Sequence, residues 1–594
     1  MKVLYATSEA RPFAASGGLG DVAGSLPQAI RARLVGCRVV LPLYESVPQH
    51  LRENMQFLTS FTVPVAWRRQ YCGVFEAHHN GVIYYLLDNQ YYFKRAGLYG
   101  HYDDAERFAF FARAILEMID HIDFKPDILH ANDWQTGLAP VYYSLFYAER
   151  PGYENIKTVF TIHNIQYQGK YGLEILEDVF GLPQSAKSLV EHDGCVNIMK
   201  GAVEASNKVT TVSPTYAQEI RDPWYAYGLD PILRAREWKL SGILNGIDTE
   251  DYNPATDPAI AASYSADDPA GKPEDKRALQ ELLSLPQEPD TPLITMVSRL
   301  VPHKGLDLVK YVLDELLQED VQFAVLGSGD WTYENFFREV QSRHPDKFCF
   351  YEGFHPEVAR KFYAGADIFL MPSKSEPCGL SQMIAMRYGT VPIVRETGGL
   401  KDTVSPYESW RDAGNGFTFA NYAGSDMLYV IREAVYLYKD YPDAFARLRA
   451  RAMACDFSWA RSAGEYLHIY STVTGQPWPP AEEPVRTEDS APAEESAPAE
   501  ETAPAEETAP AEAAEPASDE PAPQPTAEAA QSSAEPAAEE AAPAAPEKKP
   551  AARKRTAAKK PAAKKTAAKS GRRTPAKKET KPKKGTAGKQ EPAE

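Results

Sequence analysis

Glu376 and Gly379 stand in a turn between an apolar run, residues 368–371, and a helical pattern, residues 381–386. A carboxylate and a glycine at a strand-to-helix turn, here with a rigid Pro377, suggest a ligand site at the carboxyl end of a parallel sheet. There the helix offers unbonded N–H groups to an anionic ligand, and Gly379 lets a backbone approach closely. The simpler interpretation is a helix with an acidic residue near its first turn.

A second turn of the same kind carries two cations. Arg299 comes just after the apolar run 293–297, and Lys304 stands at the start of the next helical pattern. A guanidinium forks onto phosphate oxygens and an ammonium supplies a point charge, so the pair suits a diphosphate. Two cations on a solvated surface would be the simpler explanation, but the turn with Glu376 weighs against it.

The glycine-rich stretch 17–20 follows the first apolar run of the chain. It is not the GxGxxG fingerprint of dinucleotide-binding proteins, and no acidic residue follows a second strand at the expected distance. Its backbone N–H groups suit a phosphate, and a tight turn into a helix explains it equally well.

The elements that position these turns alternate between strand and helix. Strands are expected at 3–7, 127–130 and 158–162 in the first half, and at 293–297, 321–326, 348–351 and 368–371 in the second. Strands separated by helices imply parallel sheets joined by right-handed crossovers. The chain is therefore expected to be α/β, with two such units.

Length and cysteine usage limit the class of protein. A chain of 594 residues is too long for one core, so two or more domains are expected. Its six cysteines form no CxxC pair, which indicates reduced thiols without a structural zinc site. The N-terminus lacks a signal peptide and no run reaches spanning length, so we predict a cytoplasmic protein without a membrane segment.

The net charge of −18 is unevenly distributed along the chain. Residues 548–594 hold 18 Lys and Arg against three acidic residues, whereas residues 482–547 hold 19 acidic residues against Arg486 alone. Residues 488–511 repeat a six-residue unit rich in Glu, Ala and Pro. We expect disorder from residue 477 onward, because this composition has too little apolar surface to bury. The basic tail resembles histone tails and suits an anionic polymer, unless the acidic block neutralises it.

Further motifs run in order along residues 1–476. They are Ser16-Gly17-Gly18-Leu19 with Asp21, His130-Ala131-Asn132-Asp133-Trp134, Thr161-Ile162-His163-Asn164 with Tyr167-Gln168-Gly169, Val212-Ser213-Pro214-Thr215-Tyr216, Gly242-Ile243-Leu244-Asn245-Gly246-Ile247-Asp248, Ser298-Arg299-Leu300 with Lys304-Gly305, Glu376-Pro377-Cys378-Gly379-Leu380, and Thr397-Gly398-Gly399-Leu400. In this set and order, the chain resembles the glycogen and starch synthase family.

The resemblance implies two Rossmann-like domains facing a central cleft, the GT-B type of fold. The acceptor-side domain would span residues 1–240. The nucleotide-sugar domain would span residues 241–476 and end in a helix that crosses back to the first domain. A disordered acidic linker, 477–547, and a disordered basic tail, 548–594, would follow.

The resemblance also implies an activity. The enzyme would transfer glucose from ADP-glucose, with retention of anomeric configuration, to the non-reducing end of an α-1,4-glucan such as glycogen. No cofactor or metal would be needed. No second carboxylate suited to a double displacement stands out, so we prefer front-face attack through an oxocarbenium-like state.

The family's functional positions transfer to matching residues of this chain. Catalytic roles would fall to Glu376 and His163 by the transferred sugar, and to Arg299 and Lys304, which would neutralise the departing diphosphate. The donor would be bound by Gly17, Gly18, Asp21, Cys378, Gly379, Leu380 and Thr397. Asp133 and Tyr167 would lie on the acceptor side.

Two positions depart from the family pattern. Ala15 stands where the family usually has a lysine that helps to bind the donor diphosphate, and Gln135 replaces the usual histidine of an Asp-Trp-His motif. UDP-glucose therefore stays open as the donor. Two further functions also stay open: a sucrose or trehalose-phosphate synthase of the same architecture, and a catalytically lapsed glucan-binding scaffold.

Overall fold

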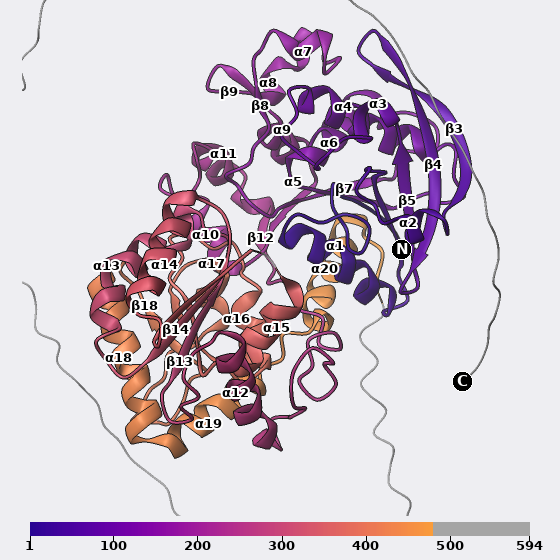
Figure 1. Cartoon of the computed structure of the whole chain (residues 1–594). Coiled ribbons are helices and arrows are strands. Elements are labelled where there is room, and N and C mark those ends of the chain that lie inside the picture. The colour runs from indigo at the N-terminus through magenta and orange to yellow at the C-terminus, as the bar shows by residue number, and fades with distance from the viewer. Residues whose placement is uncertain (354, 479–594) are drawn as a thin grey trace, which may run out of the picture. The chain divides into compact units, whose positions relative to one another are not determined.

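The computed structural model describes residues 1–353 and 355–478, which form two sheets covered by helices (Figure 1). The first sheet has nine strands in the order β12-β11-β7-β6-β1-β2-β5-β4-β3, and the second has six in the order β15-β14-β13-β16-β17-β18. A further small sheet pairs β8 (Lys170–Tyr171), β10 (Cys195–Asn197) and β9 (Glu191–His192). We call the parts built on the two large sheets the first and second lobes.

The strands of the first lobe lie within residues 2–242. They are β1 (Lys2–Ala6), β2 (Gly36–Pro42), β3 (Gln56–Val65), β4 (Arg68–His79), β5 (Val82–Asp88), β6 (Ile128–Asn132), β7 (Lys157–Ile162), β11 (Lys208–Thr211) and β12 (Leu240–Gly242). β3 and β4 are antiparallel additions at one edge, and all other neighbours pair in parallel. The three strands expected in this half of the chain are confirmed.

The β4–β5 hairpin was not predicted from the sequence, although a signal for it exists. Its turn is Asn80-Gly81, and both residues have positive φ values, 46° and 72°. Asn-Gly is the strongest short signal for a two-residue hairpin, because both central positions need the left-handed region. In this hairpin β5 pairs in parallel with β2, and β4 continues the sheet on the other side of β5.

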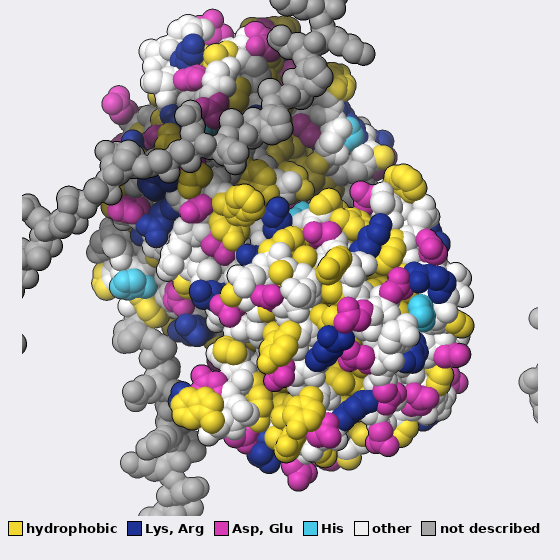
Figure 2. Space-filling model, turned by 90° about the vertical axis from the view of Figure 1, so that its left-hand side faces the viewer, with side chains coloured by type: hydrophobic (Ala, Val, Ile, Leu, Met, Phe, Trp, Pro, Cys, Tyr) yellow, Lys and Arg dark blue, Asp and Glu magenta, His cyan; other side chains and the backbone are white. Residues whose placement is uncertain are grey.

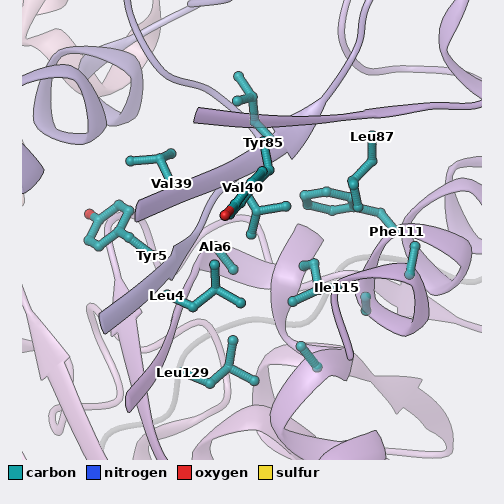
Figure 3. Close-up of a cluster of buried hydrophobic side chains, with 14 of the residues drawn as sticks. Leu4, Tyr5, Ala6, Val39, Val40, Tyr85, Leu87, Phe111, Ile115 and Leu129 are labelled. Atoms are coloured by element: carbon teal, nitrogen blue, oxygen red, sulfur yellow. The ribbon is translucent and has the colours of Figure 1, made fainter. Parts of the chain in front are cut away.

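The core of the first lobe fills the space between this sheet and α4 (Asp104–Met118). Figure 3 shows Leu4 and Leu87 facing Phe111 and Ile115 of α4, whereas Tyr5 and Val39 point to the other side of the sheet. The alternation follows from the two-residue period of a strand. Both faces of β1 are buried, as expected for a central parallel strand.

The second sheet is entirely parallel. Its strands are β13 (Leu293–Val297), β14 (Gln322–Gly327), β15 (Phe348–Glu352), β16 (Ile368–Met371), β17 (Val391–Arg395) and β18 (Phe417–Phe419). The four strands expected here are confirmed, within one residue at their ends. Together with the first lobe they confirm the α/β class.

The helices lie on both sides of the sheets. In the first lobe they are α1 (Gly18–Arg31), α2 (Gln49–Arg52), α3 (Gln90–Phe93), α4, α5 (Asp133–Thr136), α6 (Leu138–Tyr142), α7 (Ile175–Asp178), α8 (Lys187–Val190), α9 (Ile198–Ala205), α10 (Pro214–Glu219) and α11 (Asp230–Ala235). Those after β12 are α12 (Lys272–Leu282), α13 (Leu306–Leu316), α14 (Trp331–Arg343), α15 (Pro356–Gly365), α16 (Ser381–Arg387), α17 (Gly398–Thr403), α18 (Gly424–Asp440), α19 (Pro442–Met453) and α20 (Trp459–Thr474). None of the described helices is long and apolar enough to cross a membrane.

The last helix, α20, returns to the first lobe, where it lies beside α1 (Figure 1). Its residues Trp459, Tyr466 and Tyr470 are buried in the first-lobe core. The Tyr470 hydroxyl lies 2.7 Å from Nδ1 of His130 in β6, and Nε2 of that histidine lies 2.6 Å from Oγ1 of Thr161. Burial lowers the pKa of His130 to about 3, so its ring is neutral at pH 7.

The two lobes also share buried apolar side chains. One hydrophobic cluster joins Phe160 and Ile162 of β7 to Phe369 and Met383 of the second lobe. The acidic linker and basic tail predicted for 477–547 and 548–594 lie outside the described residues, apart from positions 477 and 478. The predicted domain boundary at 240/241 falls at the start of β12.

Replacing Tyr470 with Phe removes a hydrogen-bond partner from the fully buried His130 ring. We expect the free energy of unfolding to fall by about 1–3 kcal/mol, the cost of leaving a buried polar atom unpaired. Urea denaturation followed by tryptophan fluorescence measures it. Tyr311→Phe is the control: Tyr311 on α13 is 79% exposed and should tolerate the change within about 0.5 kcal/mol. Equal midpoints for the two variants would contradict the expectation.

Candidate active site

The strand order of the second sheet brings its two predicted turns together. The chain runs outward from β13 to β14 and β15, then returns to place β16 on the other side of β13. The connections that leave β13 and β16 therefore diverge, and open α/β sheets bind ligands at such a switch point. Arg299 and Lys304 follow β13, and Glu376 follows β16.

Lys304 and Glu376 form an ion pair at this point. Nζ of Lys304 lies 2.6 Å from Oε2 of Glu376, which also accepts a hydrogen bond of 3.0 Å from the Ser373 hydroxyl. The Glu376 side chain is only 9% exposed. Arg299 is exposed and forms no ion pair within residues 1–353 and 355–478, so its guanidinium is free to bind an anion.

Glycines let neighbouring loops pack tightly around this pair. Gly398 has a φ of 45°, and a Cβ there would lie 1.9 Å from the carbonyl oxygen of Glu376. The next amide, of Gly399, donates to the carbonyl oxygens of Glu376 and Pro377, 3.2 Å each. On the other side Gly305 has a φ of 75°. A Cβ placed on it would lie 2.0 Å from the Pro372 carbonyl oxygen. One neighbouring loop therefore holds the Glu376 backbone, and the other packs on Pro372 at the start of the same turn.

The residues after Glu376 lead into α16. Cys378 is buried, and burial raises the pKa of its thiol to about 12, so the thiol is protonated and a poor nucleophile. Gly379 has a φ of 74°, in the left-handed region that favours glycine. Leu380 is the N-cap residue of α16 and supplies no side-chain cap. Hydrogen bonds from residues 378–380 to a ligand would therefore come from their backbone.

The first sheet has its own switch point, between β1 and β6, because β2 and β6 lie on opposite sides of β1. His163 follows β7 next to it, and its Nε2 lies 2.9 Å from Oδ1 of Asn132 at the end of β6. Burial lowers the pKa of His163 to about 3. The ring is therefore neutral at pH 7 and acts through hydrogen bonds.

Asp133 fixes the backbone at His163. Its Oδ1 accepts the amide N–H of His163 at 2.7 Å, and burial raises the pKa of its carboxyl to about 7 against the effect of that hydrogen bond. Its φ of 54° is unusual for a residue other than glycine. Local strain of this kind persists only where the surroundings enforce it, often at functional sites.

The glycine-rich turn precedes α1 at the same edge. The Glu9 carboxylate holds it by accepting from the Gly17 amide at 3.2 Å and from the Ser16 hydroxyl at 2.7 Å. A Cβ on Gly17 or Gly18 would meet nothing within 4 Å, so the space in front of these residues is open. Asp21, in the first turn of α1, pairs with Arg11, and burial raises its pKa.

Tyr167 borders a surface hollow of about 410 Å³, and His163 is not among the residues that line it. Tyr167 and Tyr227, each about half exposed, line it together with Trp134 and Lys170. Of the two predicted acceptor residues, only Tyr167 lines the hollow, whereas Asp133 precedes the lining residue Trp134 in the chain. Aromatic rings beside amide side chains suit a sugar, which has apolar faces and a rim of hydroxyls.

Two contacts join the lobes beside Glu376. The Ser213 hydroxyl donates to the Pro377 carbonyl oxygen at 2.8 Å, and Oε1 of Glu219 accepts from Oγ1 of Thr397 at 2.9 Å. Thr397 is thus fully buried and already bonded to the first lobe. In the described chain no hydrogen bond links His163 to Glu376; the lobes supply them separately.

Sequence reasoning missed the residues that hold this site. Ser373, Asn132, Glu9, Ser213 and Glu219 all bond to predicted residues or to their loops. Ser213 carried a signal, since serine before proline is typical of a helix start. Ser373 lies three residues before Glu376, and Glu9 lies eight residues before Gly17. Of these other four, only Asn132 and Glu219 make contacts distant in sequence, which no local pattern predicts.

Comparisons with known proteins agree with the two-lobed α/β fold. A family model described as a starch synthase catalytic domain matches residues 2–235, and one described as glycosyl transferases group 1 matches residues 283–440. A glycogen synthase of Geobacillus thermodenitrificans is 52% identical over 472 residues, 79% of this chain and 97% of that protein. One of Bacillus cereus strain Q1 is 48% identical over 475 residues, 80% of this chain and all of that protein.

Among solved structures, the catalytic domain of Starch Synthase IV from Arabidopsis thaliana, bound to ADP and acarbose, superposes with a TM-score of 0.75. It is 34% identical, with 80% of this chain and 99% of that chain covered. A sucrose-phosphate synthase from Thermosynechococcus elongatus, at 16% identity and a TM-score of 0.51, shares the fold alone. With GT-B architecture and these relatives, the chain belongs to the glycogen and starch synthase family of glycosyltransferases.

Proposed function

We propose that the protein extends an α-1,4-glucan by transferring glucose from ADP-glucose to its non-reducing end, with retention of configuration. The observation that carries this proposal is the ion pair of Lys304 with Glu376 at the switch point of the second sheet. Arg299, which has no ion-pair partner among the described residues, follows the neighbouring strand. Two cations and a carboxylate there suit a sugar diphosphate. Residues 1–240 would form the acceptor side and residues 241–476 the donor side.

In the proposed reaction the leaving group is the nucleoside diphosphate. The bond between C1 of glucose and the diphosphate oxygen breaks, and the electron pair stays on that oxygen. Arg299 and Lys304 would stabilise the developing charge, a contribution that grows toward the transition state. Lys304 would then lie between two anions, the diphosphate and Glu376.

The acceptor attacks from the same face. Its O4 bonds to C1, and its proton passes to the departing phosphate oxygen. Glu376, close to the transferred glucose, would stabilise positive charge on the ring. Backbone groups of Cys378 and Gly379, and the neutral His163 ring, would bind sugar hydroxyls. A protonated Cys378 thiol fits a route without a cysteine nucleophile.

Other residues would hold the substrates. The open space at Gly17 and Gly18 suits the phosphates of the donor. We propose that Asp21 and Leu380 also contact the donor. Thr397 would act through the loop that packs on Glu376, because its hydroxyl is bonded to Glu219. Asp133 and Tyr167 would guide the acceptor toward the hollow beside Trp134.

Glucose incorporation into glycogen by the purified protein tests this function, with ADP-glucose and UDP-glucose measured in parallel. We expect transfer from ADP-glucose, and a loss of at least about 100-fold in kcat for Glu376→Gln, which keeps the volume but removes the charge. Glu281→Gln, at an exposed acid on α12, is the matched control.

Four outcomes would overturn parts of the proposal. Preference for UDP-glucose would correct the donor, and a β-linked product would correct the stereochemistry. Trapping of a covalent glucosyl-enzyme on Glu376 would exclude front-face attack. Absence of transfer from both donors, with glucan binding retained, would favour a glucan-binding scaffold.

Ala15→Lys restores the cation that the family usually has in front of the glycine-rich turn. Ala15 is exposed, so the longer side chain has room. We expect the KM for ADP-glucose to fall about fivefold, as for one additional charge-assisted contact of about 1 kcal/mol. Steady-state kinetics at fixed glycogen measure it, and Ala15→Gln separates charge from length. An unchanged KM in Ala15→Lys would show that the diphosphate does not reach this position.

The basic tail, residues 548–594, is outside the aligned part of the relatives, and we propose that it binds an anionic polymer. Its 18 Lys and Arg would neutralise phosphates and release counterions, so affinity should fall steeply with salt. Binding of duplex DNA by the full chain and by a chain ending at residue 547 is compared at about 50 and about 200 mM salt. Only the full chain should bind. Equal behaviour of the two would refute the proposal, and tighter binding after deletion of 482–547 would reveal neutralisation by the acidic block.

A further inference from the structure

Buried polar side chains near the sheet edges carry more information than the outer surface. The face shown in Figure 2 mixes hydrophobic, acidic and basic side chains, and single exposed apolar residues are normal on a protein surface. A buried polar atom, in contrast, needs a partner of the right kind, so its surroundings fix what it can do. One such group, the side chain of Asn132 at the end of β6, lies beside His163.

The amide of Asn132 is held in one orientation. Nδ2 donates to the Ala6 carbonyl oxygen at 3.0 Å, and Asn132 is fully buried. With the amide nitrogen directed at that carbonyl, Oδ1 faces the Tyr5 hydroxyl at 3.0 Å and Nε2 of His163 at 2.9 Å. The reverse orientation would place the oxygens of Asn132 and Ala6 against each other. Oδ1 is therefore an acceptor shared by two groups.

Both neighbours of Oδ1 must donate to it, because a carbonyl oxygen has no proton to give. The fully buried Tyr5 points to the side of the sheet opposite α4 (Figure 3). Burial holds the pKa of its hydroxyl well above the usual range, so Tyr5 has a proton to donate at pH 7. The same requirement puts the single proton of the neutral His163 ring on Nε2. Nδ1 is then a bare acceptor.

The groups around His163 leave Nδ1 free. Within residues 1–353 and 355–478, the ring makes one hydrogen bond, the one at Nε2. The Asp133 carboxylate accepts from the backbone amide of His163 instead of its ring. The neighbouring His130 has both ring nitrogens occupied, by Tyr470 and Thr161. Nδ1 is thus the ring atom that remains for a ligand.

We propose that Asn132, supported by Tyr5, is a positioning residue that holds His163 in the Nε2–H tautomer, so that Nδ1 accepts a hydrogen bond from a substrate hydroxyl. A bare nitrogen attracts an O–H group and repels ionised phosphate oxygens, which are acceptors themselves. The ring therefore selects the sugar of a nucleotide-sugar over its diphosphate. The identity of this ligand rests on the proposed function, whereas the tautomer follows from the protein alone.

Nitrogen-15 NMR of the full chain, labelled at histidine, reads the tautomer, because a ring nitrogen that carries a proton resonates far from one that does not. His163→Gln identifies the resonances of His163 among those of the 12 histidines. We expect a protonated Nε2 and a bare Nδ1 in the unmodified protein at neutral pH. A proton on Nδ1, alone or together with one on Nε2, would overturn the inference.

Two substitutions separate positioning from support of the fold. Asn132→Leu removes the acceptor at similar volume, so the tautomers should mix and kcat/KM for ADP-glucose should fall about tenfold, as for one lost hydrogen bond. Asn132→Asp keeps an acceptor oxygen beside Nε2 and should keep the proton there. Tyr470→Phe is the control, because it removes a buried hydrogen bond of the same lobe and should leave the His163 spectrum unchanged. An unchanged tautomer in Asn132→Leu would refute the role of Asn132.

Added ligands test the hydroxyl contact. In the Glu376→Gln background, which should slow turnover, ADP-glucose should shift the Nδ1 resonance of His163, and ADP alone should not. No shift with ADP-glucose, or equal shifts with both ligands, would refute the contact with the sugar. The spectrum of the free protein decides the tautomer even if no donor supports transfer, so failure of the proposed activity stays distinguishable.

Discussion

Reversal of strand order within each parallel sheet is the constraint on which the site depends. Crossovers leave β1 and β13 toward one side and return to place β6 and β16 on the other. Loops after these strands diverge and leave backbone N–H groups and side chains without a covering connection. Glycine-rich and charged turns occupy those positions in both lobes: Gly17 and Asp133 in the first, Lys304 and Glu376 in the second.

A charged pair at such a point needs a fixed backbone, because the proposed role of Glu376 depends on the orientation of its carboxylate. Glu376 obtains it from glycines that admit two neighbouring loops, and from the Ser213 contact of the first lobe one residue further on. The cross-lobe hydrogen bonds of Ser213 and Glu219 tie the loops next to Glu376 to the first lobe.

The sequence allowed prediction of the strands, their parallel pairing and the turns at their ends, because buried strands read as short apolar runs before glycine and charged residues. It did not reveal the β4–β5 hairpin, although Asn80-Gly81 signalled it. Nor did it reveal the bond of Asn132, a residue of one of the motifs, to His163, or that of Glu219 to Thr397, which span 31 and 178 positions. Such contacts depend on sheet order, which local patterns leave undetermined.

The protonation states limit what the active site can do. With a neutral His163 and a protonated Cys378, the proposed reaction assigns the stabilisation of charge to Glu376, Lys304 and Arg299. In the proposed reaction, catalysis by fixed charges requires the acceptor to be held in place, because the proposed route has no nucleophilic side chain that captures the glucose.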